Sequence, residues 1–116
     1  MFSLNESNNY QVYSMGVDMR KGVESLCCIV RSQSLSPADG RVYVFMNRTR
    51  CRMKLLHWER GGYVIYYKRM EQGRLSRKMF LEEEKAGFHP MRWDELVLHM
   101  EGVYPSASRR KRYNLQ

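Results

Sequence analysis

The sequence predicts a single small α+β domain in which an antiparallel sheet of about four strands, centred on a β-meander, packs with two helices. Its 116 residues suffice for one ordinary domain with a modest core. Apolar residues recur at helical spacing near the N-terminus, and runs rich in β-branched and aromatic residues alternate with turn residues in the middle of the chain. We assign residues 1–105 to the domain and residues 106–116 to a basic tail.

The N-terminal part of the chain predicts a short strand followed by a helix. The strand covers residues 10–15. Asp18 is placed to cap the helix, which extends over residues 19–31 because its apolar side chains repeat at helical spacing. These side chains are Met19, Val23, Leu26, Cys27 and Val30.

The middle of the chain predicts the meander. The stretch SQSLSPADG at 32–40 is a loop, RVYVFM at 41–46 is a strand, and NRTR at 47–50 turns the chain. A further strand is expected in QGRLSRKMF, after Gly73.

A β-hairpin joins residues 52–58 to residues 63–70, and a two-residue turn at Gly61 and Gly62 determines its predicted register. This register pairs Arg60 with Tyr63, Trp58 with Ile65, Leu56 with Tyr67, Lys54 with Arg69 and Arg52 with Glu71. Like charges directly opposite destabilise a sheet by up to about 1 kcal/mol. Either Glu71 offsets the repulsion between Lys54 and Arg69 from a diagonal position, or an anion such as phosphate lies between the two cations.

The C-terminal part predicts a second helix that Pro90 opens and Gly102 ends. Leu96, Val97 and Met100 provide its apolar stripe. The tail SASRRKRYNLQ is expected to be disordered and to add only non-specific affinity, because adjacent like charges repel and little apolar sequence follows them.

Positive charge is concentrated in the middle of the chain. Residues 41–78 hold eleven Lys and Arg residues against Glu59 and Glu71, a net charge of +9 in a chain whose total is +8. A folded protein with this charge suggests an anionic partner such as DNA. The candidate nucleic-acid-binding residues are Arg20, Lys21, Arg48, Arg50, Arg52, Lys54, Lys68, Arg69 and Arg74. Candidates for base stacking are Trp58, Tyr66 and Tyr67, although aromatic residues in a short sheet are more often core.

Other classes of function have little support in the sequence. The carboxylates do not form a pattern for catalysis, since Asp18 serves as a helix cap and residues 82–84 are adjacent glutamates that point in different directions. The histidines and cysteines lack metal-ligand spacing. We therefore expect no enzyme, no metal or other cofactor and no small-molecule substrate. Three cysteines without a disulfide pattern and the lack of a membrane-spanning stretch predict a cytoplasmic protein that does not bind membranes.

Several motifs resemble a known family, the TnpB-type (Orf2-like) accessory protein of insertion sequence 66 (IS 66) transposable elements. They are DMRKG at 18–22, the P-x-x-G-x-V-x-V-F-x-N-R stretch at 37–48, KLL-x-W at 54–58 and YYKR-x-E-x-GR at 66–74. The resemblance covers about two thirds of the chain, and Leu75 stands where the family usually has phenylalanine.

The resemblance implies a small accessory protein that is encoded beside the transposase and needed for efficient transposition, and not the RNA-guided nuclease that shares the TnpB name. Two mechanisms remain open. The protein binds DNA phosphates through the basic, aromatic-rich hairpin, with little sequence specificity. Alternatively, it is an adaptor that docks on the transposase through an aromatic or helical surface without contacting DNA. The charge distribution favours DNA.

Overall fold

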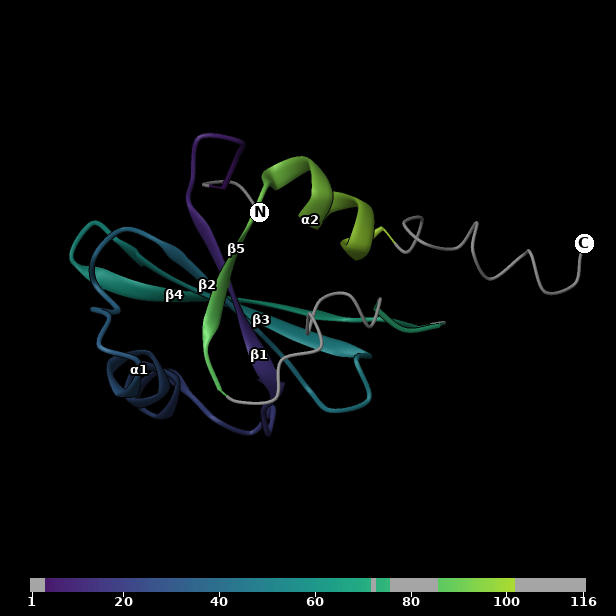
Figure 1. The fold of residues 1–116 in the computed structure, drawn as a ribbon, viewed down its shortest axis with the longest axis horizontal. Helices are drawn as coiled ribbons and strands as arrows, with labels where there is room; N and C mark the ends of the chain where they lie inside the picture. The colour runs from purple at the N-terminus through teal and green to yellow at the C-terminus, as the bar shows by residue number, and fades with distance from the viewer. Residues whose placement is uncertain (1–3, 72, 76–85, 102–116) are drawn as a thin grey trace, which may run out of the picture.

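The part of the chain that the structure describes forms one five-stranded sheet in the order β4-β3-β2-β1-β5, with two helices packed on it (Figure 1). This computed structural model describes residues 4–71, 73–75 and 86–101. The elements are β1 (Tyr10–Gly16), α1 (Val23–Ser32), β2 (Val42–Met46), β3 (Arg52–Glu59), β4 (Gly62–Arg69), β5 (Phe88–Met91) and α2 (Trp93–Met100). The predicted α+β class, the N-terminal strand and the β2-β3-β4 meander are confirmed.

The sheet is mixed and has five strands, so the prediction of an antiparallel sheet of about four strands needs correction. β1 pairs with β2 in parallel, and β5 adds to the other side of β1 in antiparallel orientation. A parallel neighbour requires a crossover connection, which α1 and its flanking loops provide. Residues 73–75 are not in a strand, and the remainder of the strand expected after Gly73 lies outside the described residues.

The second helix begins later than predicted. Pro90 does not open a helix but lies in β5, paired with Gln11, and α2 starts at Trp93. Proline is tolerated there because β5 is an edge strand, where a missing N–H does not interrupt the ladder. The predicted cap at Gly102 and the tail lie outside the described residues.

Each face of the sheet carries its own core. Val12, Val44 and Leu55 pack with Leu96 of α2 on one face. On the other face, which α1 covers, the core consists of Leu26, Cys27, Val30, Tyr43, Phe45, Leu56 and Val17. Figure 1 shows the two helices on opposite sides of the sheet. All five residues of β2 are buried because this central strand is covered from both sides.

Helix α1 starts at Val23, with Gly22 at the N-cap position, so the predicted start at residue 19 and the capping role of Asp18 are wrong. Asp18 instead organises a separate turn, in which its Oδ1 accepts a hydrogen bond from the Arg20 backbone N–H at 2.9 Å. The Lys21 N–H closes this turn onto the Asp18 carbonyl at 3.1 Å. An aspartate that bonds to the backbone two residues ahead favours such a turn over a helix.

The hairpin turn consists of Arg60 and Gly61, not Gly61 and Gly62, so the predicted register is wrong. Both turn residues have positive φ, 49° and 83°, as a type I′ turn requires. The observed pairs are Glu59 with Gly62, Trp58 with Tyr63, Leu56 with Ile65, Lys54 with Tyr67 and Arg52 with Arg69. The shift is two residues, so every side chain keeps its predicted face.

Cross-strand contacts explain this register. It places the Trp58 and Tyr63 rings edge to face, with their centroids 4.8 Å apart, and sets the Lys54 ammonium 5.6 Å from the centroid of the Tyr67 ring. Aromatic pairs and cation–π contacts of this kind stabilise a sheet, whereas the predicted register would set Lys54 against Arg69.

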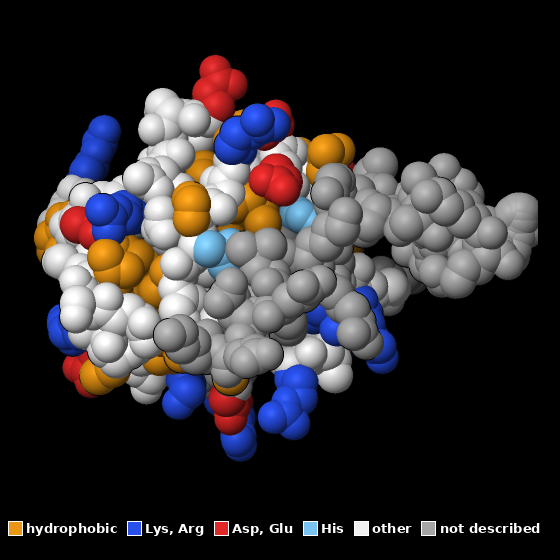
Figure 2. Space-filling model, in the orientation of Figure 1, with side chains coloured by type: hydrophobic (Ala, Val, Ile, Leu, Met, Phe, Trp, Pro, Cys, Tyr) orange, Lys and Arg blue, Asp and Glu red, His pale blue; other side chains and the backbone are white. Residues whose placement is uncertain are grey.

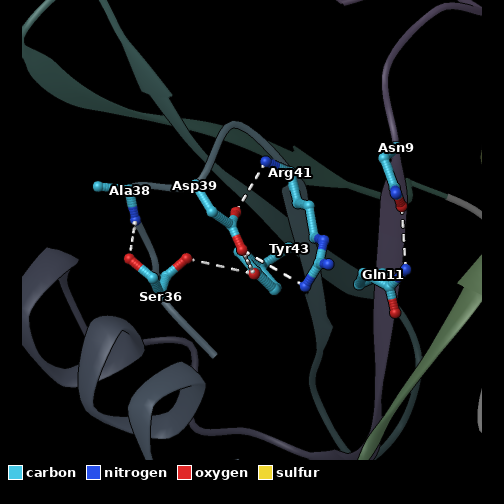
Figure 3. Close-up of polar contacts among 7 residues, drawn as sticks. All are labelled: Asn9, Gln11, Ser36, Ala38, Asp39, Arg41 and Tyr43. Atoms are coloured by element: carbon cyan, nitrogen blue, oxygen red, sulfur yellow. Dashed lines mark hydrogen bonds and ion pairs between the residues drawn. The ribbon is translucent and has the colours of Figure 1, made fainter. Parts of the chain in front are cut away.

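The loop before β2 is held by one side-chain cluster (Figure 3). The Tyr43 hydroxyl donates to Asp39 Oδ2 at 2.7 Å, and the Arg41 backbone N–H donates to Asp39 Oδ1 at 2.9 Å. Burial, and then the hydrogen bond to Asp39, raise the pKa of Tyr43 to about 12. The cluster anchors the chain at the start of β2, at the opposite end of that strand from the site described below.

Candidate nucleic-acid interface

The topology brings several basic segments to one end of the sheet. β1 and β2 are parallel and β4 runs the same way, so their carboxyl ends meet the start of β3 there. An open cleft of about 610 Å³ lies at this end, and we call it the basic cleft. Its lining includes Asp18, Arg20, Arg48, Thr49, Arg52 and Tyr67. Figure 2 shows Lys and Arg side chains along the lower margin of the molecule, with acidic side chains among them.

A close backbone approach joins the two loops that form the cleft. A Cβ atom on Gly16 would lie 2.9 Å from the Cα of Arg48, closer than real Cβ atoms come to other atoms. The Val17 N–H also donates to the Met46 carbonyl at 2.8 Å. The absence of a side chain at Gly16 therefore allows the chain leading to Arg20 to lie directly against the turn that carries Arg48.

Asn47 organises that turn. Its Oδ1 accepts hydrogen bonds from the backbone N–H groups of Cys51 and Arg52, both at 3.0 Å. From the sequence, Asn47 was expected only to lie in a turn, although an asparagine at the head of a turn is a known signal for side-chain bonding to the following backbone. The turn directs Arg48 and Arg52 to the cleft.

Arg50, between them, is directed elsewhere. Its Nε donates to the Leu75 carbonyl at 3.0 Å, and its backbone has a positive φ of 62°. The Leu75 N–H bonds back to the Arg50 carbonyl. Arg50 therefore joins the turn to the segment after β4, whose Leu75 side chain is buried in the core on the α2 face.

An ion pair between Asp18 and Arg20 lies at the rim of the cleft. Arg20 Nη2 is 2.7 Å from Asp18 Oδ2, and the Arg20 side chain remains 91% exposed. Hydrogen bonds from the Arg20 side chain and backbone hold the pKa of Asp18 well below its usual range. The same pair raises the pKa of Arg20. The cleft thus contains one carboxylate that stays ionised among its cations.

Lys54 positions the Asp18–Arg20 turn. Its Nζ donates to the Lys21 carbonyl at 2.9 Å and lies beside the Tyr67 ring. The hydrogen bond spans 33 residues of sequence and ties the turn before α1 to the hairpin. Both explanations offered for a Lys54–Arg69 pair, an offset by Glu71 or a shared phosphate, assumed that these two residues face each other, but Lys54 faces Tyr67. The Lys21 side chain is exposed at this turn.

The like-charge pair is Arg52 with Arg69. Arg69 Nε lies 3.9 Å from Glu71 Oε2, in an ion pair whose side chains are 61% and 82% exposed. Pairs this exposed contribute little to stability. Within residues 4–71, 73–75 and 86–101, the Arg48 and Arg52 side chains have no hydrogen-bond or ion-pair partner.

Other predicted site residues lie away from the basic cleft. Lys68 is opposite Met53 and therefore on the α2 face, and Arg74 is exposed beyond the end of β4. Trp58 packs against Tyr63 beside the hairpin turn. Tyr66 also faces the α2 side, where its hydroxyl donates to Glu59 Oε2 at 2.7 Å. Of the three stacking candidates, Tyr67 alone lines the cleft, and it is 51% exposed.

The described residues do not provide the features that a metal site or a membrane-spanning helix requires. They contain no group of three or more His, Cys, Asp or Glu side chains able to hold a metal ion. Cys27 is buried and Cys28 is exposed, in agreement with helical residues that point to different sides. None of the described helices is long and apolar enough to cross a membrane.

Fold and site together define a small basic α+β domain whose arginines and one exposed tyrosine converge at one end of a mixed sheet. The family model described as IS66 Orf2 like protein matches residues 8–110, so the chain belongs to the IS66 Orf2-like family, accessory proteins of transposition. The match confirms the resemblance found in the sequence and extends past the predicted domain boundary at residue 105. No curated protein and no solved structure gave a significant match.

Proposed function

We propose that this accessory protein of transposition binds DNA phosphates through the basic cleft and performs no catalytic step itself. The observation that carries the proposal is the convergence of Arg20, Arg48 and Arg52, which come from two loops and the start of β3, on one open cleft. Arginine forms strong, geometrically defined contacts with phosphate, and protein affinity for DNA depends largely on such contacts.

Electrostatics supports the same function. Arg52 and Arg69 are directly opposite each other, an arrangement that costs free energy in a sheet unless a counter-charge offsets it. Glu71 pairs weakly with Arg69 and makes no ion pair with Arg52. A phosphate near Arg52 would convert this repulsion into charge-assisted contacts.

One feature favours the adaptor function as a second candidate. A hollow of about 700 Å³ lies beside α2, and its lining includes Tyr10, Met91, Trp93 and the acidic residues Glu6, Asp94 and Glu95. Arg92 also lines it and pairs with Asp94, so Glu6 and Glu95 provide its unbalanced negative charge. Tyr10 and Trp93 stack there with centroids 5.5 Å apart. A surface that combines aromatic and acidic groups suits a basic protein partner such as a segment of the transposase.

The DNA proposal is tested by fluorescence anisotropy with element-end and random duplexes across a salt series. The double variant Arg48→Gln/Arg52→Gln should weaken binding to both duplexes and reduce the slope of log K against log salt by roughly 1.8, because each lost phosphate contact contributes about 0.9. The control Lys68→Gln/Arg74→Gln removes the same charge away from the cleft and should change the slope much less.

Two outcomes would contradict the proposal. Equal losses in both double variants would mean that overall charge, not the cleft, governs binding. Absence of binding at low salt, together with co-purification with the transposase, would favour the adaptor function.

A further inference from the structure

Tyr67 presents an aromatic face to the basic cleft. It is 51% exposed, more than any other large apolar side chain among the described residues, and the next are Met15 and Leu98 at 41%. The ring is held in place, since Lys54 lies 5.6 Å from its centroid and is itself bonded to the Lys21 carbonyl. An ordered, exposed aromatic ring between cations is the arrangement on which unpaired bases stack.

The form of the cleft distinguishes single-stranded from duplex DNA. In a duplex the faces of the bases are covered by their neighbours, so the side chains of the cleft reach only phosphates and groove edges. The cleft is open and has a volume of about 610 Å³, which is enough to receive one small molecule. A single unpaired base with its sugar fits into this space, whereas the stacked bases of a duplex cannot present a face to the Tyr67 ring.

Asp18 adds a negatively charged hydrogen-bond acceptor to the basic cleft. Its carboxylate lines the cleft and stays ionised beside Arg20, so it repels phosphate but can accept a hydrogen bond from an amino group of a base. Carboxylates accept in this way from cytosine N4. Arg48 and Arg52 provide positive charge for the adjoining phosphates.

We infer that the basic cleft binds single-stranded DNA, with one unpaired base stacked on Tyr67 and the neighbouring phosphates held by Arg48 and Arg52. This inference rests on the proposed function and narrows it, since single strands are exposed wherever an element end is opened or cleaved. It assigns Tyr67 the role of recognising an unpaired base, and the arginines that of holding the backbone.

The test compares a labelled oligodeoxycytidine of about 12 nucleotides with its duplex at equal salt. Wild-type protein should bind the single strand more tightly. Tyr67→Leu should weaken single-strand binding by about tenfold or more, because stacking contributes that much per base, while duplex binding should fall much less. Tyr67→Phe keeps the ring and should retain single-strand affinity.

A loss of affinity that is equal for single strand and duplex in Tyr67→Leu, or no loss at all, overturns the inference but leaves the DNA-binding function intact. Failure of the wild-type protein to bind either DNA at low salt overturns the proposed function itself. Photo-crosslinking of the wild-type protein to an oligonucleotide with one 5-iodocytosine checks the contact without any substitution. Mass spectrometry should locate the adduct on Tyr67, and adducts confined to other residues would contradict the inference.

Discussion

At the scale of single residues, the exposed Asp18–Arg20 ion pair lies at the rim of the basic cleft. The guanidinium bonds both carboxylate oxygens, which lowers the pKa of Asp18. Arg20→Gln should raise this pKa back toward the ordinary value of 3.8. NMR titration of the Asp18 carboxyl carbon measures the shift, and Asp94, which Arg92 holds in a similar pair, is the internal control whose lowered pKa should not move.

Gly16 is the residue whose size matters most for the cleft. Gly16→Ala should destabilise the protein by about 1–3 kcal/mol, because the new methyl group would displace the backbone at Arg48. Gly62→Ala is the matched control, since nothing lies within 4 Å of a Cβ there and the backbone is extended. Denaturant unfolding of both variants measures the difference, and an equally stable Gly16→Ala protein would show that the two loops are not in close contact.

At the scale of elements, the hairpin carries two cations with different roles: Lys54 positions a neighbouring turn, and Arg69 makes an exposed ion pair with Glu71. Lys54→Gln should cost about 1 kcal/mol, because it removes the charge-assisted hydrogen bond to the Lys21 carbonyl and the contact with Tyr67. Arg69→Gln should leave stability within about 0.5 kcal/mol or raise it slightly, since it relieves repulsion from Arg52. Thermal unfolding of the two single variants measures both changes in stability. Equal changes would contradict the observed register and support the one predicted from Gly61 and Gly62.

The raised pKa of Tyr43, whose hydroxyl holds the loop before β2, predicts a loss of folding stability at alkaline pH. The pKa of Tyr43 is raised from 10.0 to about 12, so the folded state keeps this tyrosine neutral where the unfolded state ionises it. Its contribution to stability is therefore complete below pH 10 and is lost as the pH rises from 10 to about 12. Tyr43→Phe cannot ionise and should show a smaller loss of unfolding free energy over this interval. An unchanged pH profile would place the tyrosine hydroxyl in solvent.

At the scale of the whole molecule, the basic cleft and the hollow beside α2 lie near opposite ends of β1, since Gly16 lines one and Tyr10 the other. Six residue steps of strand separate them by roughly 20 Å, about twice the Debye length at 0.1 M salt. Variants at the two places should therefore act independently. Glu6→Gln/Glu95→Gln should leave DNA affinity nearly unchanged, and Arg48→Gln/Arg52→Gln should leave co-purification with the transposase unchanged. Mutual effects in either assay would indicate a single continuous binding surface.

Local patterns in the sequence were sufficient for several features of this protein. The α+β class, the meander, the helix around Leu26 and Val30 and the family followed from periodicity, turn residues and motif order, because these depend on neighbours in sequence. The basic residues of the middle segment were also visible as a concentration of charge.

Only the tertiary structure decided how these parts are arranged. The parallel pairing of β1 with β2 and the insertion of Pro90 into β5 depend on which strands bury which faces, and no local signal specifies that choice. The hairpin register depended on the fit between Trp58 and Tyr63 and between Lys54 and Tyr67 across the strands. Long-range contacts also decided the different roles of the arginines around one turn. Arg48 and Arg52 line the cleft, whereas Arg50 bonds to the Leu75 carbonyl, because alternate side chains of a turn point to different surroundings.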